Sequence, residues 1–187
     1  AIVTKPGYDP NLLVGRVRSK NYSQLLKDEL KPLFNRAMMA YYPPGSTFKL
    51  VNALIAQQEE IITPATVFPH SFVVGSKSVK CHPHPGGLGL EGAVQYSCNP
   101  YFCNTFRAFV DNRKFVTSEK GYKLWRDYVL SFGIGRKIGV DLPHELEGNV
   151  PKVDFYDRYY GKGRWKASTI FSLGIGQGEL GVTPLQM

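Results

Sequence analysis

The sequence lacks long hydrophobic runs and dense clusters of basic residues, and it contains few cysteines. No apolar stretch approaches the ~20 residues that a membrane-spanning helix needs, and no stretch has the pattern of a secretory signal peptide. Three cysteines are an odd number, which excludes a complete disulfide framework. Lysine and arginine are scattered along the chain, without a recognisable nucleic-acid motif, and this argues against a nucleic-acid partner.

The composition is that of a folded, cationic domain or part of one. Hydrophobic residues make up 43% of the 187 residues and aromatic residues 13%, which suffices for a packed core. The net charge of +8 is compatible with an anionic envelope polymer or a membrane surface as partner. The chain begins without methionine and stops just after Thr183-Pro184, a helix-start pattern. We therefore expect residues 1–187 to form one partial domain, truncated at both ends.

The hydrophobic pattern predicts mainly helices, joined by loops rich in glycine and proline. Helices are expected at 22–34, ended or kinked by Pro32, at 46–57, at 90–96, from Asn99 as N-cap onward through an aromatic face to Val110, and at 119–131. A strand end is expected at 1–5, a small hairpin at 71–74 and 78–80, and loops at 81–89 and 134–164. Residues 168–182 combine an apolar run with four glycines.

The sequence Tyr-Pro-Pro-Gly-Ser-Thr-Phe-Lys at 42–49 places a serine and a lysine at the start of a buried helix. Ser46 and Lys49 are three residues apart and share one helix face. A serine becomes a nucleophile when a base removes its proton, and a lysine can be that base when burial or nearby positive charge lowers its pKa. The free N–H groups of the helix start would stabilise an oxyanion. A capping serine beside a solvated lysine is the alternative interpretation.

A second polar turn, Ser97-Cys98-Asn99, lies at the start of the next aromatic helix. A serine in such a turn can relay a proton between a lysine and a leaving group, and a carboxamide can donate to and accept from a substrate amide. A simple capped turn is the alternative, since Ser19-Lys20-Asn21 has the same spacing.

Four motifs occur in order: Tyr-Pro-Pro-Gly-Ser-Thr-Phe-Lys at 42–49, Ser-Cys-Asn-Pro-Tyr-Phe at 97–102, Phe-Gly-Ile-Gly at 132–135 with Gly-Val-Asp-Leu-Pro at 139–143, and Gly-Ile-Gly-Gln-Gly-Glu-Leu at 174–180 with Val-Thr-Pro-Leu-Gln at 182–186. In this order they resemble the transpeptidase domain of class B penicillin-binding proteins, most closely the elongation-type penicillin-binding protein 2 group. The resemblance covers nearly the whole chain. It implies the α/β (α+β) fold that serine β-lactamases share with penicillin-binding transpeptidases.

The resemblance also implies a role for each residue of the two turns. Ser46 would attack the carbonyl of a D-Ala-D-Ala stem peptide, with Lys49 as the general base. Ser97 would pass protons to the leaving group, and Asn99 would contact the substrate amide. A neighbouring stem-peptide amine would then take the acyl group and cross-link peptidoglycan, whereas a β-lactam would leave Ser46 acylated. No cofactor is required for this chemistry.

The third motif of the family, Lys-Thr-Gly or Lys-Ser-Gly on a core strand, is missing. None of the 14 lysines begins it, and Lys77-Ser78-Val79 comes nearest. In the family this strand follows the Thr-Pro-Leu-Gln segment. We therefore expect this fragment to be predominantly helical with an incomplete sheet, and to react with penicillin very slowly or not at all.

Cysteine and histidine gather in one part of the sequence. The residues that gather there are zinc-type ligands in zinc-type numbers, although their spacing fits no standard zinc finger: His70, Cys81, His82, His84 and Cys98. The candidate ligand set is His70, Cys81, His84 and Cys98. Such a metal would be structural, and Cys98 would tie it to the Ser97/Asn99 turn. A polar loop with a free buried thiol is the alternative interpretation.

Three functions are therefore open. The first is a D,D-transpeptidase on the outer face of a bacterial cytoplasmic membrane, anchored by a helix absent here and working with a membrane glycan polymerase of the elongation machinery. The second is a β-lactamase or β-lactam sensor of the same fold. The third is a non-catalytic transpeptidase-like module that binds wall polymer or a partner protein.

Overall fold

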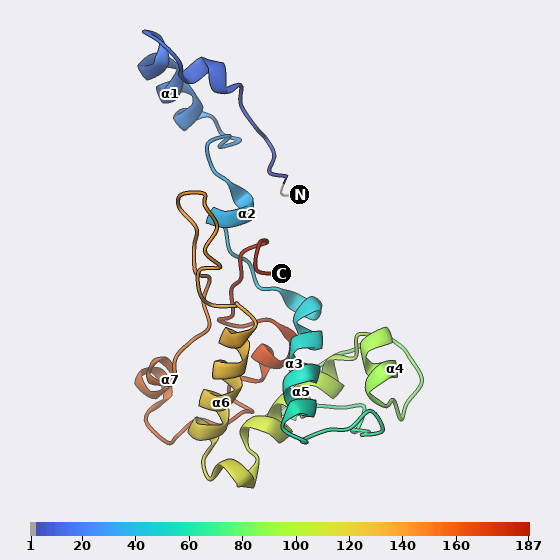
Figure 1. Ribbon diagram of the computed structural model, residues 1–187. Coiled ribbons are helices and arrows are strands. Elements are labelled where there is room, and N and C mark those ends of the chain that lie inside the picture. Colours follow the sequence, from blue (N-terminus) through green and yellow to red (C-terminus); the bar gives the residue numbers. More distant parts are fainter. Residues whose placement is uncertain (1–2) are drawn as a thin grey trace.

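The computed structural model describes residues 3–187, and within them helices predominate over strands (Figure 1). The α-helices are α1 (Arg18–Lys27), α2 (Arg36–Met39), α3 (Lys49–Gln58), α4 (Leu90–Gln95), α5 (Asn99–Val110), α6 (Ser118–Ser131) and α7 (Val153–Tyr160). The 3-10 helices are η1 (Pro10–Leu13), η2 (Gly45–Phe48), η3 (Arg113–Phe115) and η4 (Phe171–Ile175). Among these residues none of the helices has the length and apolar character to cross a bilayer.

Helix α5 is the centre of the fold, with α3, α6 and η4 packed around it. Its aromatic face is buried, as the sequence predicts, and meets the indole of Trp125 from α6: the ring centroids of Phe106 and Trp125 are 5.2 Å apart and nearly perpendicular. Phe48, the last residue of η2, packs against the same indole, with the two ring centroids 6.0 Å apart. Since each large side chain stabilises a fold by ~1.5–3 kcal/mol when fully buried, this cluster fixes the three helices against one another.

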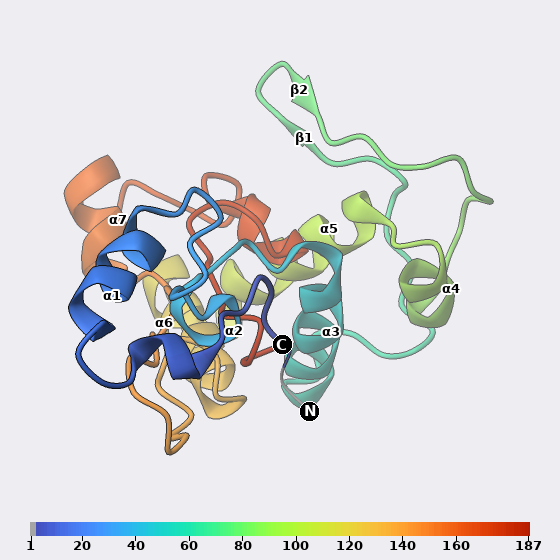
Figure 2. The same cartoon turned by 90° about the horizontal axis from the view of Figure 1, so that it is seen from above.

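The hairpin predicted in the region 71–80 is confirmed, in a shorter form. Strand β1 (Val73–Val74) pairs antiparallel with β2 (Lys77–Ser78), and the pair projects from the helical body (Figure 2). Two isolated bridges, Tyr42 with Val182 and Asn149 with Gly181, join distant segments. With a single two-stranded sheet in residues 3–187, the fragment is helical with little sheet, as expected.

Several expected elements are wrong in their bounds or their type. The helix expected at 22–34 begins earlier and ends at Lys27, because Asp28 adopts an extended conformation (φ −62°, ψ 125°). Helix α7 lies inside 134–164, for which the sequence predicts loops. Its many tyrosines and charged residues make its hydrophobic period hard to recognise in the sequence. Thr183-Pro184 opens only a turn. Of the strand end expected at 1–5, residues 1–2 lie outside the described range, and 3–5 are not extended into a sheet.

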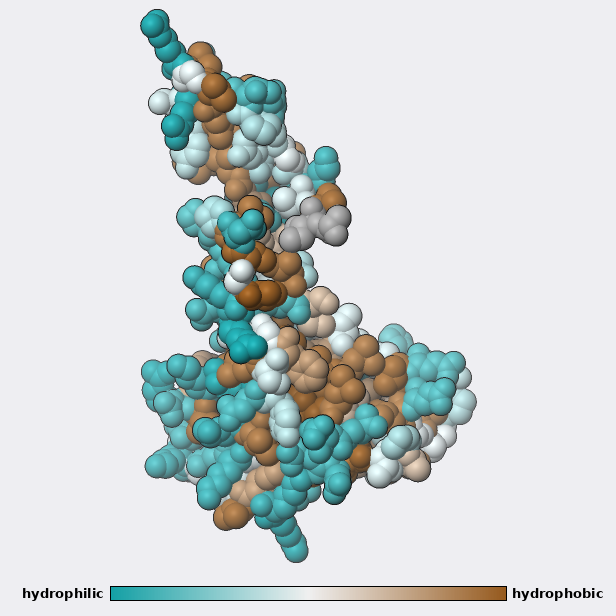
Figure 3. Space-filling view, in the orientation of Figure 1, coloured by the Kyte–Doolittle hydropathy of each residue, from teal (hydrophilic) through white to brown (hydrophobic). Residues whose placement is uncertain are grey.

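Helix α3 is also less buried than the apolar pattern predicts. One face packs into the core through Asn52, Ala53, Ile55 and Ala56, but Leu50 and Leu54 on the other side are 55% and 53% exposed. Figure 3 shows apolar side chains gathered on this side of the molecule. The helix therefore combines a core face with an apolar outer face, which is unusual for a surface helix.

Candidate active site

The serine of the first motif sits on a turn that the rest of the chain holds in place. Gly45 opens η2 with a positive φ of 60°, and its amide N–H donates to the carbonyl of Gly176 over 2.8 Å. Ser46 follows and is exposed to solvent. The backbone N–H of Lys49 donates to the carbonyl of Ser46, so the turn leads directly into α3. The sequence thus predicts the helix start correctly, although its first turn is 3-10 rather than α.

Gly176 must be glycine for two separate reasons. Its φ is +69°, a left-handed conformation that other residues adopt at a cost. A Cβ atom added there would lie 2.2 Å from the carbonyl oxygen of Gly45 and 2.7 Å from the Cβ of Phe48. The glycine-rich segment therefore touches the backbone beneath Ser46, and this explains why the sequence needs small residues there.

Lys49 points away from solvent and toward the second motif. Its side chain is only 2% exposed, and its Nζ lies 2.8 Å from Ser97 Oγ, 2.7 Å from the Ser97 carbonyl oxygen and 2.7 Å from Asn99 Oδ1. Burial desolvates the ammonium and lowers the pKa of Lys49 below its ordinary value. The structure therefore brings three of the four predicted residues into direct contact, with the fourth, Ser46, one turn before Lys49.

The Ser97/Asn99 turn has an unusual backbone. Ser97 has a φ of +50°, which is uncommon for a residue other than glycine. Cys98, not Asn99, is the N-cap residue of α5, so the capping role expected for Asn99 is wrong by one position. The Asn99 carboxamide is thereby free to accept from Lys49 and to donate to the carbonyl of Lys80 over 3.1 Å. The polar turn is thus more than a cap.

One buried side chain near the site was not singled out from the sequence. Asn52, one turn after Lys49 on α3, donates to the carbonyl of Gly174 over 2.8 Å and accepts from the indole N–H of Trp125 over 2.7 Å. An asparagine within an apolar helical run signals a buried polar contact, but the sequence alone does not identify its partner.

The cysteine and histidine side chains do come together. The ligand atoms of His70, Cys81, His84 and Cys98 all lie within 4.8 Å of one another, although the residues come from two loops and a helix start. Cys81 Sγ is 3.4 Å from His84 Nε2. His84 Nδ1 lies 2.7 Å from the carbonyl oxygen of Pro85, an arrangement in which Nδ1–H donates and Nε2 keeps a lone pair for a ligand.

The surroundings of this cluster fit a zinc ion in chemistry and in size. A small hollow is bordered by His70, His84 and Cys98, but not by Cys81. All three cysteines are free thiols, and burial raises the pKa of Cys98 to about 11. Two imidazoles and two thiolates would form a tetrahedral Cys₂His₂ set, for which neighbouring ligand atoms need to approach within ~3.3–3.8 Å. Only a modest contraction from the present arrangement would be needed.

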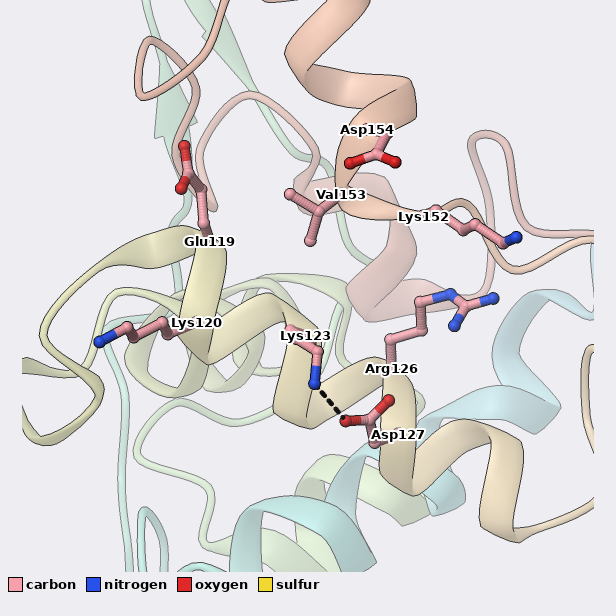
Figure 4. Close-up of a pocket in the computed structure, with 8 residues that line it drawn as sticks. All are labelled: Glu119, Lys120, Lys123, Arg126, Asp127, Lys152, Val153 and Asp154. Carbon is pink, nitrogen blue, oxygen red and sulfur yellow. Dashed lines mark hydrogen bonds and ion pairs between the residues drawn. The ribbon is translucent and has the colours of Figure 1, made fainter.

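A larger hollow of about 420 Å³ lies between α6 and α7, away from the serine and lysine (Figure 4). It is bordered by charged side chains of both signs, including Arg126 and Lys152, and Lys123 pairs with Asp127 across 3.4 Å. Both members of this pair are largely exposed, so water screens them. This hollow is not the candidate active site, because none of the residues that line it is a candidate nucleophile.

Comparison with known proteins finds similarity along the whole chain. The family model described as the penicillin binding protein transpeptidase domain matches residues 1–187. Peptidoglycan D,D-transpeptidase MrdA of Haemophilus influenzae is 33% identical over 100% of this chain and 28% of its own length. Penicillin-binding protein 2 of Pseudomonas aeruginosa, solved in complex with WCK 5153, is 28% identical with a TM-score of 0.82, covering 98% of this chain and 39% of that one.

A third match is a solved peptidoglycan synthase complex, described for its structural coordination of polymerization and crosslinking. It is 28% identical with a TM-score of 0.78, and the match covers 98% of this chain and 30% of that one. The chain spans less than a third of the length of the curated relative named above. From the family match over its full length, the chain belongs to the penicillin-binding protein transpeptidase family.

Proposed function

We propose that the protein to which this chain belongs is a peptidoglycan D,D-transpeptidase, a serine acyltransferase that cross-links stem peptides. The observation that carries the proposal is the buried Lys49 amine, held by Ser97 and Asn99 one turn after an exposed serine. The family match and the D,D-transpeptidase relative support the same reaction.

In the proposed first step Ser46 Oγ attacks the carbonyl carbon between the two terminal D-alanines. Its proton passes to the neutral Lys49 amine, which burial favours. The bond from that carbonyl to the last D-alanine breaks, and the leaving nitrogen receives a proton through Ser97, whose Oγ lies 2.8 Å from Lys49 Nζ. The donor peptide is then an ester on Ser46.

In the second step an amine of a neighbouring stem peptide attacks this ester. Its proton returns along the same route, a new amide forms, and Ser46 regains its hydroxyl. Asn99 would hold the donor amide, because its carboxamide can donate and accept at once. A β-lactam would open on Ser46 in the same way and remain attached.

The test is labelling of the full-length protein with a fluorescent penicillin. We expect one label per molecule, on the peptide that contains Ser46, and none in the Ser46→Ala variant. Slow release of the label distinguishes a transpeptidase from a β-lactamase, which would turn the drug over. Absence of any covalent label on the folded full-length protein would overturn the proposal in favour of a non-catalytic module.

We propose in addition that His70, Cys81, His84 and Cys98 bind a structural zinc ion. The convergence of the four ligand atoms supports this, and the ion would brace the turn through Cys98, the residue between Ser97 and Asn99. Transpeptidation itself requires no cofactor in this proposal.

We also propose an extracytoplasmic location at the cytoplasmic membrane, because the substrate is the cell-wall stem peptide. A membrane glycan polymerase of the elongation machinery is the proposed partner. The similarity to a synthase complex that couples polymerization to crosslinking supports this partner. Nucleic acid is not part of the proposal.

A further inference from the structure

Asn52 is a deeply buried carboxamide beside the reactive turn. Its side chain is 3% exposed, and both ends of its amide are engaged. Oδ1 accepts from Trp125 Nε1 over 2.7 Å, while Nδ2 donates to the carbonyl of Gly174 over 2.8 Å. One side chain thus joins α3, α6 and the glycine-rich segment.

The second end of this connection reaches the residue before the nucleophile. Gly174 and Gly176 belong to one short segment, and the Gly176 carbonyl accepts from Gly45 N–H over 2.8 Å. Gly174 itself is packed closely: an added Cβ would lie 2.8 Å from the Cβ of Phe106 and 2.9 Å from the carbonyl of Phe102 on α5. The segment is therefore packed closely against α5 and bonded to α3 through Asn52.

The segment Gly174–Gly176 therefore contacts both the start of η2, through Gly45, and helix α3, through Asn52. Lys49 lies three residues before Asn52, so both side chains project from the same face of α3. If the bond from Asn52 to Gly174 is broken, the glycine segment and the turn at Gly45 can shift relative to Lys49. Displacements of about 1 Å in a catalytic group can cost ~10²-fold in rate.

Resting on the proposed acyl transfer, we infer that Asn52 is a positioning residue: through Gly174–Gly176 it fixes the distance between the Ser46 turn and Lys49. It touches neither substrate nor reacting atoms. An apolar residue at this position would leave both the Trp125 N–H and the Gly174 carbonyl without their partners.

The experiment uses the full-length protein and measures the acylation of Ser46 by a fluorescent penicillin at several drug concentrations. This separates the dissociation constant of the first complex from the rate constant of acylation. For Asn52→Leu, which keeps the volume, we expect the acylation rate constant to fall at least tenfold. We expect the dissociation constant to change less than twofold, because no drug contact is removed.

Asn52→Asp provides a second measurement that depends on the bond itself. An aspartate keeps the acceptor for Trp125 but donates to Gly174 only when it is protonated. Burial raises the pKa of such a carboxyl, so the ratio of variant to wild-type acylation rate should increase as the pH is lowered. This variant also decides the matter if Asn52→Leu does not fold.

Tyr122→Phe is the matched control. It removes another buried hydrogen bond from α6, the one of 2.7 Å from Tyr122 Oη to the Pro151 carbonyl, without touching the glycine segment. If Asn52→Leu and Tyr122→Phe lower Tm alike and both acylate within twofold of wild type, the inference is overturned. If the wild type itself is not acylated, the proposed function fails instead.

Discussion

Gly176 lies so close to Gly45 that a Cβ atom added to it would be only 2.2 Å from the Gly45 carbonyl oxygen. This contact joins the end of the glycine-rich segment to the turn that carries Ser46. The two motifs are therefore packed directly against each other, although they are far apart in the sequence.

Gly176→Ala should therefore be among the most damaging single substitutions in the chain. The strained φ and the clash together should lower the free energy of unfolding by about 2–4 kcal/mol and reduce acylation at least tenfold. Gly133→Ala is the control: its φ is +87°, but an added Cβ meets nothing within 4 Å, so only the backbone cost of about 1–2 kcal/mol applies. Urea unfolding of both variants checks the difference, and equal losses would contradict it.

Lys49 should control the pH dependence of acylation. Because burial lowers the pKa of Lys49, the amine becomes neutral at a pH below the ordinary lysine value of 10.5. The acylation rate should rise with pH and reach its half-maximum below 10.5. Lys49→Arg retains the charge but provides no base, and it should lose ~10²–10⁴-fold in rate. A flat profile in the wild type would exclude Lys49 as the base.

Asn99→Asp should move that profile in a known direction. The new carboxylate would lie beside Lys49 Nζ, where Asn99 Oδ1 is now 2.7 Å away, and would favour the ammonium. We expect the half-maximum to shift upward by ~1–3 pH units, with slower acylation at neutral pH. Asn99→Ala, which adds no charge, should slow acylation without this upward shift.

Metal analysis tests the proposed zinc site. Full-length protein purified without chelators in the presence of zinc should contain about one equivalent, and Cys81→Ser should reduce that content at least tenfold. Cys103→Ser is the control, since Cys103 is a buried thiol outside the cluster. Less than a tenth of an equivalent in the wild type would count decisively against the site.

Glu145 should stabilise its loop in a pH-dependent way. Its carboxylate accepts from the backbone N–H groups of Ile138, Gly139 and Val140, and the first of these bonds contributes most to lowering the pKa of Glu145. A lowered pKa means that stabilisation is present above the unfolded-state value and is lost as the pH falls through the folded-state value. Hydrogen exchange at these three amides should therefore lose protection in acid, and Glu145→Gln should lose it already at neutral pH.

The sequence predicts those parts of the fold whose chemistry is local. Prolines and glycines before Ser46, Pro100 after Asn99 and the hydrophobic period of α6 each determine an element within a few residues. The same holds for the hairpin, whose turn at Gly75 has the positive φ of 59° that glycine favours. Elements of this kind need no knowledge of the tertiary structure.

Long-range packing determines what the sequence does not reveal. Helix α7 is stabilised by Tyr156, which is fully buried between Tyr122 and Trp165, and none of these contacts can be inferred from spacing. The capping assignment at Asn99 is wrong because the helix begins one residue earlier, and the Asn99 side chain accepts instead from Lys49, fifty positions earlier. The convergence of His70, Cys81, His84 and Cys98 could only be a hypothesis before the loops were placed in space.

The hydrogen bond between Gly45 and Gly176 has a consequence for the order of events during synthesis. A ribosome makes the serine and lysine long before it makes the glycine segment that supports them. The turn at Ser46 therefore acquires its final shape only after residue 176 has emerged and folded back. A nascent chain stalled at α6 should therefore not react with penicillin.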